Sequence, residues 1–185
     1  CALPIYDRLF AETESTGSGP TRVGPVFVND NLIDLTITPT RAGQMAQVAV
    51  RPKASFLRVD SRLETAAPGT PLYTWYQFVS PHELVLTGKI AADSKSVLRV
   101  AEVPHAASFA RSLFIEALER AGVGTNASPL TRQEGVALGL SRTELAKLPE
   151  AARLSSPPFA ENAKLILKVS HNLHASGLPL LLAAR

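Results

Sequence analysis

The sequence predicts an α+β protein in which a β-rich region comes first and helices follow. Up to Val103, short segments either alternate apolar with polar residues or are rich in β-branched and aromatic side chains, and proline and glycine separate them. From Pro104 onwards, apolar residues recur at the spacing of a helix face. The chain has 185 residues, of which 45% are hydrophobic, so it can bury one ordinary core or two small ones.

Six strands are predicted before Pro104. In Ile33–Thr38 apolar and polar residues alternate, which indicates a strand with one face in water. Gly88 is expected to end the fifth strand, so we interpret Thr87-Gly88-Lys89 as a turn. The other expected strands are Met45–Val50, Phe56–Val59, Tyr73–Val79, Glu83–Thr87 and Val97–Val103. Short strands separated in this way favour a small sandwich or barrel-like domain.

The first long helix is predicted over Pro104–Ala121. Phe109 and Leu113 recur on one face, and proline suits a first helical turn. Gly122 follows directly, where a glycine commonly caps the end of a helix. The next stretch, Gly124–Leu154, is predicted to be irregular, apart from a short helix that begins at a capping box of Ser141 and Glu144.

Two further helices are predicted near the end of the chain. The first follows the segment Ser156-Pro157-Pro158, and the second begins near Asn172 or Leu173. The apolar side of the first helix consists of Phe159, Ala163, Ile166 and Leu167.

Composition bounds the possible functions. The net charge is only +3 and no basic run is interleaved with aromatic residues, so nucleic acid is not an expected partner. The single cysteine, Cys1, excludes an internal disulfide and a cysteine-rich metal site. Cys1 is either the lipid-modified first residue of a mature lipoprotein or an arbitrary point within a longer gene. No signal peptide or transmembrane span is expected, because the most apolar run, Leu178–Ala184, is too short to cross a bilayer.

The candidate site is the triplet Ser170-x-Asn172, which follows a predicted helix. Alone it is a weak signal, because a helix-capping serine and a turn asparagine would look the same. Its surroundings are more specific. A Ser-Pro-Pro segment begins the preceding helix, and Leu165–Ala175 carries the triplet between two helical stretches.

These features resemble the second active-site motif of the class C, low-molecular-mass penicillin-binding proteins, which are D-alanyl-D-alanine carboxypeptidases and endopeptidases. Two upstream blocks, Val28–Asn31 and Phe109–Val123, resemble the same family and occur in the same order. The resemblance implies a β-rich inserted region followed by helices of an incomplete penicillin-recognising (β-lactamase-like) serine transpeptidase domain. The expected organisation is an inserted region at 1–125 that ends in a helix, a connecting segment at 126–154, and a helical part of the catalytic domain at 155–185.

The resemblance also implies a chemistry. In the family, a Ser-x-x-Lys motif supplies the nucleophile and its base, and a Lys-Thr-Gly strand binds the substrate carboxylate. By the same correspondence, Ser170 would relay a proton and Asn172 would orient the substrate through its amide. The expected substrates are peptidoglycan stem peptides ending in D-Ala-D-Ala, with β-lactams as ligands of the complete parent protein. No cofactor or metal is expected, and the implied location is the periplasm or cell envelope.

This sequence departs from the family pattern in two places. No serine is followed by a lysine three residues later, and Lys-Thr-Gly does not occur. We therefore expect this chain to be an internal piece of a larger enzyme, and we expect the piece to be inactive alone. Whether the parent enzyme prefers carboxypeptidase or endopeptidase chemistry is left open. The alternative is a non-catalytic β-rich module that binds the cell envelope. If the chain is such a piece, its last helices lack the sheet on which they pack in the parent. The apolar faces that carry Phe159, Ile166 and Leu180 should then be exposed.

Other candidate residues have simpler interpretations. His171 and His174 are three residues apart and could share a helix face as metal ligands, but no third ligand lies nearby in sequence. We interpret them as exposed or helix-start histidines, with His171 able to touch substrate. Tyr73, Trp75 and Tyr76 could form an aromatic platform for sugar or peptidoglycan. Strand alternation puts Trp75 and Tyr76 on opposite faces, so at least one should be core. His82 and His105 are interpreted as structural.

Overall fold

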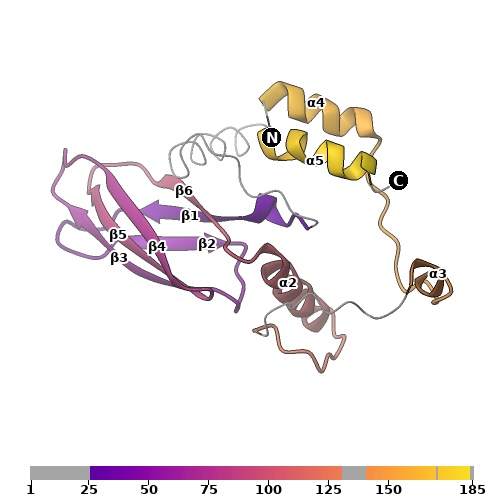
Figure 1. The fold of residues 1–185 in the computed structure, drawn as a ribbon. Helices are drawn as coiled ribbons and strands as arrows, with labels where there is room; N and C mark the ends of the chain where they lie inside the picture. The colour runs from indigo at the N-terminus through magenta and orange to yellow at the C-terminus, as the bar shows by residue number, and fades with distance from the viewer. Residues whose placement is uncertain (1–25, 131–140, 170, 184–185) are drawn as a thin grey trace. The chain divides into compact units, whose positions relative to one another are not determined.

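The computed structural model describes residues 26–130, 141–169 and 171–183 (Figure 1). The chain forms two compact units, Cys1–Thr131 and Arg132–Arg185. Among the described residues, the first unit contains two three-stranded sheets and the long helix α2, and the second contains three helices. The predicted α+β class is therefore confirmed.

One sheet of the first unit has the strand order β2-β1-β6. Its strands are β1 (Leu32–Thr38), β2 (Gln47–Arg51) and β6 (Val97–Glu102), and both pairings are antiparallel. In the centre of the sheet, Leu35 pairs with Val50 on one side and with Arg99 on the other.

The other sheet has the order β3-β5-β4. Its strands are β3 (Arg58–Ala66), β4 (Tyr73–Ser80) and β5 (Glu83–Ala91). β4 and β5 pair antiparallel, whereas β3 pairs parallel with β5. The central strand of this sheet is thus the last of the three in the chain.

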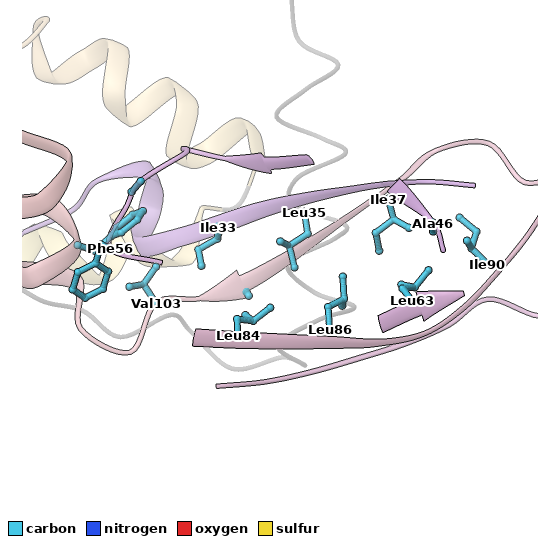
Figure 2. Close-up of a cluster of buried hydrophobic side chains, with 13 residues drawn as sticks. Ile33, Leu35, Ile37, Ala46, Phe56, Leu63, Leu84, Leu86, Ile90 and Val103 are labelled. Atoms are coloured by element: carbon cyan, nitrogen blue, oxygen red, sulfur yellow. The ribbon is translucent and has the colours of Figure 1, made fainter. Parts of the chain in front are cut away.

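The two sheets share one hydrophobic core. Figure 2 shows Ile33 and Leu35 of β1 pointing toward Leu84 and Leu86 of β5, and all four side chains are buried. The edges of the two sheets are also joined, because Ala46 N–H donates to the Leu63 carbonyl of β3 at 2.8 Å. Of the two forms that the sequence predicts, a sandwich or a barrel-like domain, the two packed sheets correspond to the sandwich.

Gly88 lies within β5 and does not end it. It pairs with Thr74 of β4, and a Cβ atom at this position would lie 2.0 Å from the backbone oxygen of Tyr73. The interpretation of Thr87-Gly88-Lys89 as a turn is wrong, because the glycine here permits close approach of a neighbouring strand. The third strand also differs from its prediction: Phe56 precedes it as a buried turn residue, and the strand extends to Ala66.

The second face of β1 is only partly in water: Thr36 is exposed, as its alternation predicts, but Leu32 and Asp34 are buried, contrary to that prediction. Asp34 is only 3% exposed and forms an ion pair with Arg51 of β2 at 2.7 Å. Leu32 and Val100 form a second small apolar cluster, against which Leu98 packs. A central strand can be buried on both faces, and alternation alone does not reveal this.

Helix α2 (Ala106–Arg120) matches the predicted helix within two residues at each end. Phe109 is fully buried in the core, and its ring centroid lies 6.3 Å from that of Phe56. At the end of the helix, Gly122 has a φ of 80°. Val123 N–H donates to Leu118 O at 2.9 Å, which completes a Schellman cap and confirms the predicted role of Gly122.

The second unit contains α3 (Arg142–Leu145), α4 (Phe159–Val169) and α5 (Asn172–Ala183). The capping box at α3 is confirmed, because Glu144 N–H donates to Ser141 Oγ at 3.3 Å and Ser141 N–H donates to the Glu144 carboxylate at 2.7 Å.

On α4, Phe159 is 62% exposed, as predicted. Ile166 is buried at 8%, so the expectation that it would be exposed is wrong, whereas Leu167 beside it is 82% exposed. The side chain of Leu180, which was also expected to be exposed, lies outside the described residues.

Candidate functional site

The triplet Ser170-x-Asn172 lies where α4 ends and α5 begins. α4 ends at Val169, and Asn172 is the first residue of α5. Ser170 itself and the side chain of Asn172 lie outside the described residues. The helix–triplet–helix order predicted from the sequence is therefore present in the backbone, and the roles of the two side chains stay predictions.

His171, the middle residue of the triplet, forms the N-cap of α5. Its carbonyl accepts the N–H of Ala175 at 3.0 Å, which is the first helical bond of α5. Its ring Nδ1 accepts the N–H of His174 at 3.4 Å. This bond satisfies one of the donors that every helix start leaves unpaired within the helix. The side chain that separates the two candidate site residues therefore holds the helix start in place.

The same residue is tied back to the preceding helix. His171 N–H donates to the carbonyl of Ile166 at 3.0 Å, and the side chain of Ile166 is buried. On α5, Leu173 is 3% exposed, and α4 and α5 pack together. A backbone hydrogen bond and the packing of the two helices thus both join the end of α4 to the start of α5.

The two histidine rings stack on each other. Their centroids are 3.9 Å apart and their planes make an angle of 28°. His171 is buried at 7%, and His174 is half-buried. Of the two interpretations offered for these residues, exposed or helix-start histidine, the structure supports the second for His171, whose buried ring caps the helix and stacks on His174.

This arrangement has consequences for the chemistry of the triplet. Asn172 occupies the first helical position, so the positive end of the α5 dipole lies at the triplet. A hydroxyl and an amide held at such a helix start can donate hydrogen bonds to carbonyl or carboxylate oxygens of a ligand. Such groups bind and orient, but they do not provide an activated nucleophile, which needs a neighbouring base.

Sequence reasoning allowed His171 as a helix-start residue but missed that its side chain caps the helix. Preferred N-cap residues are Ser, Thr, Asp and Asn, so a histidine gives no capping signal. It also missed the bond from His171 to Ile166, which links two helices whose ends were each predicted separately. No pattern in the sequence would have revealed either contact.

The other histidines singled out in the sequence lie in the first unit. His82 is structural, as predicted: its ring packs edge-on against Phe56 at 4.4 Å, and its Nδ1 lies 3.0 Å from the Phe56 carbonyl oxygen. His105 precedes α2 as its N-cap residue. Cys1 lies outside the described residues. In the part of the chain that the structure describes, no helix is both long enough and apolar enough to cross a membrane.

Comparison with protein families decides the relationship. The family model of the D-Ala-D-Ala carboxypeptidase 3 (S13) family matches residues 14–184. This chain belongs to that family. The match extends over both units and includes the triplet, and it confirms the resemblance inferred from the sequence.

Two solved structures with a similar chain trace bear related names. Penicillin binding protein 4 (dacB) from Haemophilus influenzae is 14% identical, with a TM-score of 0.47 over 59% of this chain and 25% of that one. The same protein complexed with a novel β-lactam is 16% identical, with a TM-score of 0.46 over 71% of this chain and 35% of that one. The S13 chain thus spans a quarter to about a third of the structures it matches. A search of curated protein sequences gave no match.

Proposed function

We propose that this chain is part of a serine-type D-alanyl-D-alanine carboxypeptidase or endopeptidase that acts on peptidoglycan stem peptides through an acyl-enzyme. The observation that carries the proposal is the S13 family match, which includes the triplet at the junction of α4 and α5. The helix–turn–helix backbone around the triplet supports it, because such a junction can present two short polar side chains to a substrate.

In this proposal Ser170 and Asn172 have different tasks. A serine hydroxyl is both donor and acceptor, so Ser170 can pass a proton between a neighbouring base and the leaving amine. The amide of Asn172 donates a hydrogen bond without carrying charge, so it can hold a substrate carbonyl in one orientation. Both tasks assist a nucleophile and neither replaces it.

The nucleophile and the carboxylate-binding strand are proposed to come from other parts of the parent polypeptide. Neither Ser-x-x-Lys nor Lys-Thr-Gly occurs in these 185 residues. Residues 155–185 would then complete a catalytic domain, with 1–125 as an inserted region and 126–154 as the connection. The parent would bind β-lactams and would act in the periplasm or cell envelope.

The test is covalent labelling by a fluorescent penicillin. The isolated chain should stay unlabelled, whereas the complete parent polypeptide should be labelled. In the parent, Ser170→Ala should slow acylation by about 100-fold, the size of a proton-transfer contribution. Asn172→Ala should slow it by about 100-fold as well, because a misplaced substrate reacts that much more slowly. Ser176→Ala is the matched control, because Ser176 is an exposed serine on α5, the helix that begins at Asn172. This substitution should leave labelling unchanged.

Labelling of the isolated chain would overturn the assignment of roles. If the parent carrying Ser170→Ala were labelled as fast as the parent carrying Ser176→Ala, Ser170 would have no role in the chemistry. A parent that no penicillin acylates would favour the alternative, a non-catalytic module that binds the cell envelope.

A further inference from the structure

The outer face of β4 presents large side chains to solvent. Alternation along the strand places Tyr73, Trp75 and Val79 outward, and these side chains are 62%, 58% and 55% exposed. β4 is an edge strand of its sheet, so these residues lie on the outer face of the sheet, next to its edge. Apolar and aromatic groups gathered in this way commonly mark a binding surface. We call Tyr73, Trp75, Gln77 and Val79 the aromatic strip.

The opposite face of β4 holds the strip in place. Tyr76 and Phe78 point inward and pack against the shared core, with ring centroids 6.5 Å apart in an edge-on arrangement. Thr74 Oγ accepts a hydrogen bond from Arg99 of β6 at 3.2 Å. The aromatic strip is therefore carried by a strand that is fixed to both sheets, so that binding costs little ordering of the backbone.

The charged side chains next to the strip are already paired with one another. On the same face of the sheet, Lys89 lies 3.9 Å from Glu64, Arg62 lies 2.9 Å from Asp60, and Arg58 lies 4.0 Å from Glu83. Each basic group has a carboxylate partner, so the face has no net charge among these six residues. A polyanion such as nucleic acid, or an anionic lipid surface, would find no excess of positive charge here.

Polar groups that can hydrogen-bond lie beside the aromatic rings. Thr87 is directly opposite Trp75 in the sheet, and Lys89 is directly opposite Tyr73. Gln77, one alternation further along β4, is exposed. Directly opposite residues share a face of the sheet and lie within side-chain reach. The surface thus combines flat apolar rings with hydroxyl, amide and ammonium groups at their edges.

We propose that the aromatic strip binds the glycan strand of peptidoglycan, with sugar rings stacked on Tyr73 and Trp75. Sugar rings are uncharged, have an apolar C–H face that packs on an aromatic ring, and carry hydroxyl and amide groups around their edge. Tyr73 and Trp75 are two residues apart along β4, about 7 Å, so one extended saccharide can lie across both. This assignment rests on the proposed function for the identity of the polymer. The proposal goes beyond the proposed reaction on the stem peptide, because it assigns the glycan strand a binding surface of its own.

The single tryptophan of the sequence makes the test direct, because all tryptophan emission comes from the strip. The 185-residue chain is titrated with soluble oligomers of N-acetylglucosamine, and the emission of Trp75 should change and saturate. Tyr73→Ala should weaken the apparent affinity at least ten-fold. Phe114→Ala is the matched control, since Phe114 is a 65% exposed aromatic residue on α2, and it should titrate like the unmodified chain.

A second measurement uses purified glycan strands from which the stem peptides have been removed, at high salt, which screens the lactyl carboxylates that this removal exposes. The chain should co-sediment with them, and Trp75→Ala, with an unchanged circular dichroism spectrum, should not. The proposal is overturned if the oligosaccharides leave the emission unchanged and the Trp75→Ala chain sediments with the strands as well as the unmodified chain does. It is also overturned if the emission depends on chain concentration alone and a dimer forms, because the edge of β4 would then pair with a second copy. If penicillin fails to label the complete parent but the chain still binds glycan, the proposed function is wrong and the glycan-binding proposal stands.

Discussion

Arg51 donates two hydrogen bonds to one carboxylate oxygen of Asp34. Nε lies 3.0 Å and Nη2 lies 2.7 Å from Oδ2, and the two residues are register partners on β2 and β1. The Asp34 carboxylate is almost fully buried, whereas the Arg51 side chain is 70% exposed. A guanidinium at the rim of the sheet thus compensates a carboxylate in its interior.

Removal of this guanidinium should destabilise the first unit. Arg51→Ala leaves a buried carboxylate without this partner, and we expect a loss of about 2 kcal/mol in the free energy of unfolding, less than for a fully buried pair because water reaches Arg51. Urea unfolding measures it. Arg62→Ala removes a surface pair with Asp60 and is the control, with an expected loss under about 1 kcal/mol. Equal losses of unfolding free energy in the two variants would show that the burial of Asp34 does not strengthen its ion pair with Arg51.

Two glycines with positive φ should respond differently to alanine. Gly88 has no room for a Cβ atom beside the Tyr73 backbone, so Gly88→Ala should separate β4 from β5 and cost more than about 3 kcal/mol. Gly43 has a φ of 82° and nothing within 4 Å of a Cβ, so Gly43→Ala should cost only about 1 kcal/mol, from its backbone conformation. Thermal unfolding of both variants checks the difference, and a Gly88→Ala chain as stable as Gly43→Ala would contradict it.

These two cases show how far local patterns predict the fold. Alternation and β-branched residues predicted β1, β4 and β6 because those signals lie within one strand. The burial of Asp34 and the position of Gly88 inside β5 depend on neighbouring strands far away in sequence. Gly88 was interpreted as a strand end because its close approach to Tyr73 of β4 is not visible in β5 alone. The parallel pairing of β3 with β5 is equally non-local.

In the candidate site, too, some features were predictable from local sequence and others were not. The helices on either side of the triplet were predictable, since apolar spacing and the Ser-Pro-Pro segment are local signals. The hydrogen bonds that shape the turn were not, because they use a histidine as the cap and a carbonyl from the preceding helix. The roles of Ser170 and Asn172 come from family resemblance, and the labelling experiment decides them.

The ionisation of Tyr76 should make the stability of the first unit fall at high pH. Burial raises the pKa of Tyr76 above its ordinary value of 10.0. The unfolded chain therefore loses this proton at a lower pH than the folded chain, and the stabilisation is complete below pH 10 and is lost as the pH rises through the folded pKa. Unfolding free energies between about pH 8 and pH 11 should fall less for Tyr76→Phe than for the unmodified chain. The same slope for both would show that another group titrates.

The His171 cap should control the geometry of the triplet. His171→Ala removes the acceptor for the His174 N–H and the ring that stacks on His174, so we expect α5 to fray at its start and the second unit to lose about 1 kcal/mol of stability. His171→Asn restores a preferred capping side chain of shorter reach and should recover most of that loss. Amide hydrogen exchange at His174 and Ala175 measures the fraying directly. If the cap also positions Asn172, penicillin acylation of the complete parent should slow with His171→Ala and recover with His171→Asn. Recovery of exchange protection without recovery of acylation would mean that the imidazole ring itself, and not the cap it forms, serves the reaction.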